Sequence, residues 1–420
     1  MHFFVFILQS ILTIRTKKVK IEKIILGVNM EETKKRVYLD SATTTYVNKE
    51  VLTEMLPVFN SVYGDPSKDY SIGREAKKLV DEAKKRVALG INADETEIYF
   101  TSGETESNNW AILGLARANK NKGKHIITSK IEDKSILLAC KQLESEGFEV
   151  TYIGCDETGV VSLSQLMHAI RQDTVLVSIQ VANGDVGTIQ NLNAIARTVK
   201  EKDILFHCDA TFALGAMSLD VKTIPIDAMT LSSHRIYGPK GVGALFVKNG
   251  VKIDGVLLGE YGANGMRAGV INTAGVVGFG KAVELATRDV TVSARKIKNA
   301  RDYLTKGIMQ KIDGVSLNGH QYQRVASISN LCFDCVDNEA LATLLDTQGI
   351  EVSFCGDRTH QNQTLVAMDK TPTEINSSIR FSISKNVSKE DCDYVIDKLT
   401  VLVKKLREVS PLRRSTKESK

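Results

Sequence analysis

The sequence has few prolines, few cysteines and little excess charge. Only six prolines occur in 420 residues and no internal repeat is visible, so a solenoid or low-complexity architecture is excluded. The seven cysteines are odd in number and irregularly spaced, which excludes a disulfide framework and predicts a reducing, cytoplasmic location. The formal net charge is +5, from 55 basic and 50 acidic residues, so nothing in it indicates nucleic acid or a membrane as partner.

The two ends of the chain differ from the rest. Residues 2–13 are strongly apolar but too short to span a membrane. Their charges follow the apolar run, whereas a secretory signal carries charge before it. A second, ordinary start opens at Met30. We therefore predict that residues 1–29 are an extension outside the fold, and that the basic tail, residues 409–420, is disordered.

The body of the chain alternates short β-rich runs with amphipathic helices. Strands are predicted at 97–101, 125–129, 149–153, 174–180, 204–208, 227–231 and 242–247, with helices such as 74–89, 105–120, 134–146 and 191–201 between them. This alternation predicts an α/β domain over residues 45–290, with a mainly parallel sheet covered on both faces. Beyond residue 290 the pattern changes to helices at 294–312 and 388–407 around strands near 326–333 and 378–384. We expect residues 30–44 and 291–408 to form a smaller α+β domain.

The first candidate site follows the predicted strand 97–101. Residues 101–106 read Thr-Ser-Gly-Glu-Thr-Glu and open a helix. Free amides at a helix start, with Ser102, Gly103 and Thr105, can cradle a phosphate. The alternative is a plain capping box. Glu104 puts a negative charge where a phosphate would sit.

Two further motifs follow later strands. Asp209 ends a β-rich run, where a carboxylate points into the ligand crevice of a parallel sheet and can hold a protonated ring nitrogen. A polar strand end or helix cap is the alternative. Residues 232–241 follow the next strand and combine Ser232, Ser233, His234 and Arg235 with a Gly-Pro-Lys-Gly turn.

Together these motifs resemble the NifS/IscS-type cysteine desulfurases, which are class V aminotransferases with the fold type I of pyridoxal 5'-phosphate (PLP) enzymes. The resemblance runs from about residue 36 to 408 and includes residues 39–44 (LDSATT), 73–76 (GREA), 183–187 (NGDVG) and 377–382 (SSIRFS).

The resemblance implies PLP as cofactor and a role for each matching residue. Asp209 would bond the pyridine nitrogen, and Arg380 would receive the substrate carboxylate as a bidentate clamp. The remaining cofactor contacts would come from Ser102, Gly103, Thr105, Asn183, Ser232 and His234. The family also implies a homodimer and a sulfur-acceptor or scaffold protein as partner. No metal site is expected.

The departures from the family pattern lie at its chemical centre, which marks a degenerate member. Arg235 stands at the position of the Schiff-base lysine, and a guanidinium stays protonated and cannot practically form that aldimine. The ring-stacking histidine corresponds to Asp133. Three further positions also differ, with Phe212 for a glutamine, Gly184 for an asparagine and Val270 for a threonine.

The loop that carries the persulfide cysteine is altered as well. Aligned position for position, the nucleophile becomes Arg358. Cys355 lies nearby and is either a displaced nucleophile or a bystander.

Three functions remain open at this stage. The first is a catalytically inactive or altered desulfurase homologue that acts as a binding or regulatory partner in sulfur or iron–sulfur metabolism. The second is an active PLP-dependent desulfurase that uses Cys355 and supplies sulfur for iron–sulfur clusters or thio-modification. The third is a binding protein for another anion. Six of the residues discussed are expected to converge on one pocket: Thr105, Asp209, Ser232, His234, Arg235 and Arg380. If Asp209 and Arg235 lie close together there, the pair would form a salt bridge in the cofactor's place.

Overall fold

The computed structural model describes residues 35–260, 265–354 and 361–410. The predicted N-terminal extension lies outside the described residues, as do Cys355, Arg358 and all but the first two residues of the predicted tail.

A seven-stranded sheet forms the centre of the larger part of the molecule, in the order β2-β8-β7-β6-β5-β3-β4. Its strands are β2 (Ile98–Thr101), β3 (His125–Ser129), β4 (Glu149–Ile153), β5 (Thr174–Ser178), β6 (Leu205–Asp209), β7 (Ala228–Ser232) and β8 (Gly243–Val247). Only β8 runs antiparallel to its neighbours in this sheet. The predicted α/β fold with a mainly parallel sheet is therefore confirmed, and each strand lies within two residues of its predicted range.

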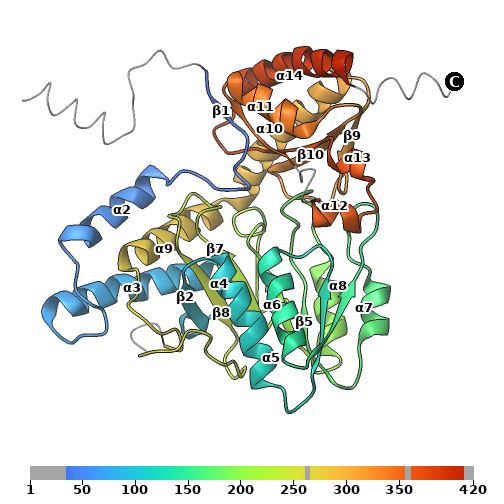
Figure 1. Cartoon of the computed structure of the whole chain (residues 1–420). Helices are drawn as coiled ribbons and strands as arrows, with labels where there is room; N and C mark the ends of the chain where they lie inside the picture. The colour runs from blue at the N-terminus through green and yellow to red at the C-terminus, as the bar shows by residue number, and fades with distance from the viewer. Residues whose placement is uncertain (1–34, 261–264, 355–360, 411–420) are drawn as a thin grey trace, which may run out of the picture.

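Helices cover both faces of this sheet (Figure 1). They are α2 (Lys49–Asn60), α3 (Ser71–Gly90), α4 (Glu104–Asn109), α5 (Leu115–Ala118), α6 (Lys134–Ser145), α7 (Leu163–Ala169), α8 (Leu192–Lys200) and α9 (Thr273–Arg288), with short turns η1 (Glu95–Glu97) and the π-helical η2 (Trp110–Gly114). Successive residues of a strand point to opposite faces. Ile126 of β3 accordingly packs with Trp110 and Leu143, whereas Ile127 packs in the core that contains Ile195 and Phe279. Burial on both faces explains why β3, β5, β7 and β8 have no exposed side.

A second, smaller group of helices and strands lies above the large sheet in Figure 1 and has its own hydrophobic core. It contains the antiparallel sheet β12-β13-β10-β9 and the parallel pair β1-β11. The strands are β1 (Val37–Tyr38), β9 (Val315–Asn318), β10 (Ile328–Phe333), β11 (Ile350–Glu351), β12 (Ser353–Phe354) and β13 (Ser378–Ser382). The helices are α10 (Val290–Lys311), α11 (Asn338–Thr347), α12 (Gln363–Ala367), α13 (Pro372–Ile375) and α14 (Lys389–Val409). Val37 and Leu39 are buried in the same core as Phe381, so the segment before α2 packs with the C-terminal part of the chain.

The topology brings three loops to one edge of the large sheet. The strands β2, β6 and β7 all end at this edge, because β8 reverses direction between β2 and β7. The segment after β1 crosses the same region, where the Thr45 amide donates to the His234 carbonyl at 3.0 Å. Within the described part of the chain, no helix is both long and apolar enough to cross a membrane.

Candidate cofactor site

The carboxylate of Glu104 lies among the side chains expected to hold a phosphate. Ser232 Oγ donates to Glu104 Oε2 at 2.6 Å, and His234 Nε2 lies 3.0 Å from Oε1. Arg235 Nη2 donates to Oε1 at 3.1 Å. Three side chains from the end of β7 and the loop that follows it therefore surround one carboxylate at the start of α4.

This cluster is largely withdrawn from solvent, since the side chains of Glu104 and Arg235 are each 16% exposed. Burial opposes ionisation of Glu104, but the hydrogen bonds from His234 and Ser232 and the charge of Arg235 outweigh it and hold the pKa of Glu104 well below its ordinary value. The carboxylate is thus an anion at neutral pH. Ser232, His234 and Arg235 therefore bind a negative charge that belongs to the chain itself, where a ligand phosphate was expected.

Arg235 is also fixed by an aromatic ring. Its guanidinium carbon lies 4.2 Å from the centroid of the Phe212 ring, a cation–π contact. Arg235 therefore pairs with Glu104 on one side and Phe212 on the other. The suggested Asp209–Arg235 salt bridge is absent among the described ion pairs, because Glu104 from the neighbouring loop takes the guanidinium instead.

The ring of Phe212 depends on a glycine at position 184. A Cβ atom on Gly184 would lie only 2.3 Å from Cε2 and Cζ of Phe212. Real Cβ atoms do not approach a ring so closely, so a side chain at position 184 would force the Phe212 ring to move. Two departures from the family pattern, phenylalanine for glutamine and glycine for asparagine, are therefore one packing arrangement.

Asp209 lies buried at the end of β6, as expected from its place on the sheet. Asn108 Nδ2 donates to its Oδ2 at 2.9 Å, and the Thr211 amide donates to its Oδ1 at 2.9 Å. Burial raises the pKa of Asp209 above its ordinary value, against the lowering effect of these hydrogen bonds. The side chain is oriented by protein groups and lines a cavity together with Arg235 and Arg380.

Asp133 caps a helix. Its carboxylate accepts from the Ser135 amide at 2.8 Å and from Ser135 Oγ at 2.6 Å, which makes it the N-cap of α6. Asp133 also lines the cavity of Asp209 and is among the charges that raise the pKa of Asp209. An aspartate here therefore stabilises the helix start and adds negative charge where the family places an aromatic ring.

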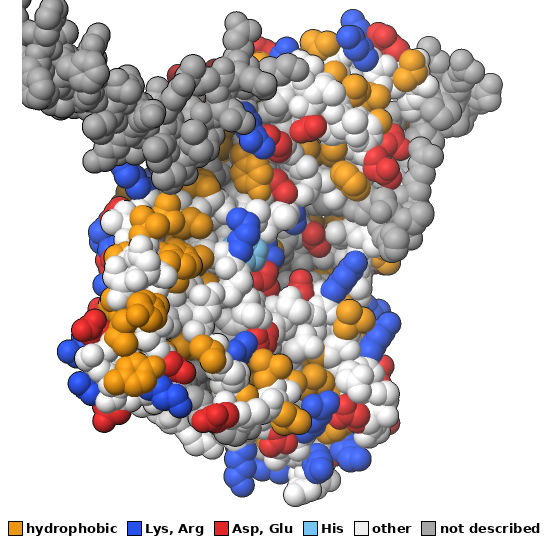
Figure 2. All heavy atoms as spheres, turned by 60° about the vertical axis from the view of Figure 1, so that its left-hand side comes forward, with side chains coloured by type: hydrophobic (Ala, Val, Ile, Leu, Met, Phe, Trp, Pro, Cys, Tyr) orange, Lys and Arg blue, Asp and Glu red, His pale blue; other side chains and the backbone are white. Residues whose placement is uncertain are grey.

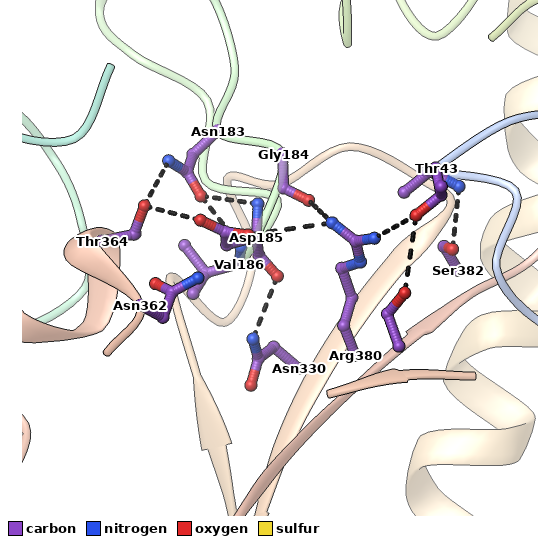
Figure 3. A network of polar contacts seen from close by, with 12 residues as sticks. Thr43, Asn183, Gly184, Asp185, Val186, Asn330, Asn362, Thr364, Arg380 and Ser382 are labelled. Carbon is purple, nitrogen blue, oxygen red and sulfur yellow. Dashed lines mark hydrogen bonds and ion pairs between the residues drawn. The ribbon is translucent and has the colours of Figure 1, made fainter. Parts of the chain in front are cut away.

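Arg380 projects from β13 into a network of acceptors (Figure 3). Its Nη1 donates to the Gly184 carbonyl at 3.1 Å. Its Nη2 donates to Thr43 Oγ1 at 2.8 Å and to Asp40 Oδ1 at 3.2 Å. Both terminal nitrogens are therefore engaged by the protein, and a carboxylate ligand would have to compete with Asp40 and Thr43 for them.

Of the remaining residues predicted to bind the cofactor, one bonds to its own turn and three line a cavity. Asn183 Oδ1 accepts from the amides of Asp185 and Val186 at 2.9 Å each and so closes its own turn. Ser102, Gly103 and Thr105 line an open cavity with Glu104 and His234. Asn183 instead lines the cavity of Asp209, Arg235 and Arg380, so the predicted residues gather around two cavities instead of one.

Comparison with known proteins identifies the family. The family model described as Aminotransferase class-V matches residues 37–395. The chain belongs to this family. Among its curated relatives, the protein named Cysteine desulfurase IscS from Methanosarcina thermophila is 44% identical over 390 residues, which cover 92% of this chain and 96% of that protein. A protein of the same name from Clostridium botulinum is 43% identical over 384 residues, which cover 90% of this chain and 97% of that protein.

Solved structures agree with this assignment. The structure titled "NIFS-LIKE PROTEIN" superposes with a TM-score of 0.82 at 32% identity, covering 89% of this chain and 99% of that chain. The NifS-like protein from Rickettsia africae gives a TM-score of 0.80 at 25% identity, covering 88% of this chain and 100% of that chain.

The class V aminotransferase family uses PLP, and the residues of this chain fit it at one end of the site only. Asp209 is in place for a ring nitrogen. At the other end the donors expected for the phosphate already bind Glu104, and a second anion would be repelled by this carboxylate. Arg235 offers no nucleophilic amine. The site as a whole does not fit PLP.

Two sets of contacts at this site were not predicted from the sequence. Asn108, the donor to Asp209, lies one helical turn after Thr105, and this spacing would have placed both on the same side of α4. Asp40 and Thr43, which bind Arg380, stand inside the motif at residues 39–44, but their contact with β13 gives no signal in the sequence.

Proposed function

We propose that this protein is a non-catalytic member of the cysteine desulfurase group, which acts as a cytoplasmic binding or regulatory partner in sulfur or iron–sulfur metabolism. The observation that carries the proposal is the Glu104 carboxylate, bound by Ser232, His234 and Arg235. Sulfur release from cysteine in this family depends on PLP. A chain whose own carboxylate takes the phosphate donors, and whose lysine position holds arginine, lacks the means to use that cofactor.

A homodimer is part of this proposal, and an apolar face supports it. Leu52, Leu56 and Phe59 recur at helical spacing on one side of α2, and Phe59 is 64% exposed. Figure 2, which brings forward the side of Figure 1 that carries α2, shows hydrophobic side chains gathered there. A second copy of this chain is the occupant to expect from the family. Light scattering should give a dimer for the wild type and a monomer for Leu56→Asp combined with Phe59→Asp, while Lys49→Asp at the polar start of α2 should remain dimeric.

An active cysteine desulfurase is the second candidate, and the names of the relatives favour it. Two proteins called cysteine desulfurase share 44% and 43% identity with this chain over nearly their whole length. The chain also keeps Asp209 and Arg380. In this case Cys355 would be the thiol that takes the sulfur.

The assay for sulfide release from cysteine, with saturating PLP, separates the two candidates. We expect no turnover above the level of buffer with free PLP, and no absorbance beyond the protein band after the protein is separated from unbound cofactor. The Methanosarcina thermophila relative serves as positive control. Robust turnover that disappears in Cys355→Ala would overturn the proposal and assign Cys355 as nucleophile.

A further inference from the structure

A second cavity adjoins the candidate cofactor site. Its volume is about 130 Å³. Arg235, Phe212 and Ala42 line both this cavity and the one that contains Asp209, so these three residues form the partition between them. A single water needs roughly 10–15 Å³ of such space, so this cavity has room for a small organic molecule.

The wall of the cavity is mainly apolar and carries positive charge. Its larger apolar side chains include Val51, Leu214, Leu285, Ile297 and Ile383. Its two charged residues are Arg235 and Lys385, and no aspartate or glutamate lines it. A cavity with a hydrocarbon wall and cations but no carboxylate matches a small anion that has an apolar body.

Lys385 is the cation that is available to such an anion. Its Nζ lies 4.4 Å from the centroid of the Tyr237 ring, and it makes no ion pair within the described ranges. Burial lowers the pKa of Lys385, and Lys296 lowers it further while Glu50 acts in the opposite direction. An anion beside Nζ would favour the charged form of this lysine.

The wall of this cavity also holds polar groups without partners in the described part of the chain. Thr211, which lines the cavity, is 2% exposed, and its Oγ1 has no hydrogen-bond partner among the residues that the structure describes. The same holds for Nε of Arg235. Buried polar atoms are nearly always hydrogen-bonded in native proteins, so two such atoms beside one cavity point to a ligand with an acceptor group.

We propose that this cavity binds a small organic carboxylate with an apolar aromatic or branched aliphatic body. The carboxylate lies against Lys385, and the hydrocarbon part packs against Leu214, Leu285 and Ile297. The cavity shares Ala42, Phe212 and Arg235 with the candidate cofactor site, but Lys385 and the apolar wall take no part in the proposed function, so this inference stands or falls separately from it.

Calorimetric titration of the full chain tests the inference with benzoate, benzyl alcohol and inorganic sulfate as probes. Benzoate should bind about tenfold more tightly than benzyl alcohol, because a hydrogen bond to a charged partner adds to the same ring contacts. Sulfate should not bind measurably, since it has no apolar body. If the wild type binds neither benzoate nor benzyl alcohol, or binds sulfate as tightly as benzoate, the inference is wrong.

Variants locate the site. Lys385→Met should weaken benzoate about tenfold and leave benzyl alcohol unchanged. Lys296→Met, which removes a nearby exposed charge outside the cavity wall, is the matched control and should bind benzoate like the wild type. Ala294→Phe, at a position that lines the cavity, should abolish binding of both aromatic probes while thermal unfolding shows a folded protein. Unchanged benzoate affinity in Lys385→Met would overturn the inference even if Ala294→Phe fails to fold.

Discussion

The two ends of the candidate cofactor site differ in how far they depart from the family pattern. At the Asp209 end, a buried carboxylate is held by Asn108 and by the Thr211 amide. At the opposite end, Ser232 and His234 are retained but bind the carboxylate of Glu104. One end thus keeps its aspartate, which protein groups hold in place, whereas the other keeps its residues and gives them a carboxylate of the chain as partner.

This difference has a physical cause. Asp209 is tied into the interior by hydrogen bonds to a helix and to its own turn, so its replacement would disturb the fold as well as any ligand. The donors at the opposite end need an anion but do not specify its source. A carboxylate at the start of α4 satisfies them from within the chain, and the presence of phosphate-binding residue types is therefore no proof of a bound phosphate.

Reversing the changes at the phosphate end should have the largest effect. The variant Arg235→Lys with Glu104→Ala should bind PLP and show absorbance beyond the protein band, because a nucleophilic amine is restored and the competing carboxylate is gone. Arg235→Lys alone should bind PLP at least about tenfold more weakly, since Glu104 would still repel the phosphate. A PLP titration followed by absorbance measures both. A colourless double variant would show that the Phe212 region also excludes the cofactor.

The contact between Gly184 and the Phe212 ring can be tested by substitution at both positions. Gly184→Asn should lower the free energy of unfolding by about 3 kcal/mol, because its Cβ would collide with the Phe212 ring. Adding Phe212→Gln should recover more than half of that loss, as expected for residues in contact. Urea unfolding of the two single variants and the double variant measures the coupling. Additive effects would mean that the two positions are independent.

Removing the charge of Glu104 should destabilise the protein by about 2 kcal/mol at neutral pH, because Arg235 is left without its carboxylate. The folded-state pKa of Glu104 lies below its unfolded value, so this contribution is present above about pH 4.3 and is lost as the pH falls through the folded pKa. The difference in unfolding free energy between the wild type and Glu104→Gln should therefore shrink on acidification. Glu82→Gln, an exposed change on α3, should show little difference at any pH.

Removing the charge of Asp209 should change the unfolding free energy less than removing that of Glu104, and its pH dependence should have the opposite sign. The folded-state pKa of Asp209 is raised by burial, so its contribution is greatest below its unfolded pKa of about 3.9 and is lost as the pH rises through the folded value. Asp209→Asn should thus change the unfolding free energy by only about 1 kcal/mol, and the variant should gain on the wild type as the pH rises. If the unfolding free energy of Asp209→Asn instead falls relative to the wild type as the pH rises, the ionised form of Asp209 stabilises the folded protein and this prediction is wrong.

Much of the fold followed from the sequence alone. Alternating β-rich runs and amphipathic helices predicted the strands of the large sheet, because periodicity and burial are local properties of the chain. The motif positions also placed Asp209, Ser232 and His234 at strand ends, and the lysine-to-arginine change at position 235 was visible directly.

The partners of these residues were decided by tertiary structure. Glu104 and Arg235 are 131 positions apart and meet only because β8 inserts between β2 and β7, which brings two distant loops to one edge. Gly184 and Phe212 read as two unrelated changes until the fold places the Phe212 ring against the α-carbon of Gly184. Sequence thus determined which chemical groups this protein carries. Only strand order and packing decided which of them touch, because contacts across a sheet depend on the spatial order of the strands and not on their order along the chain.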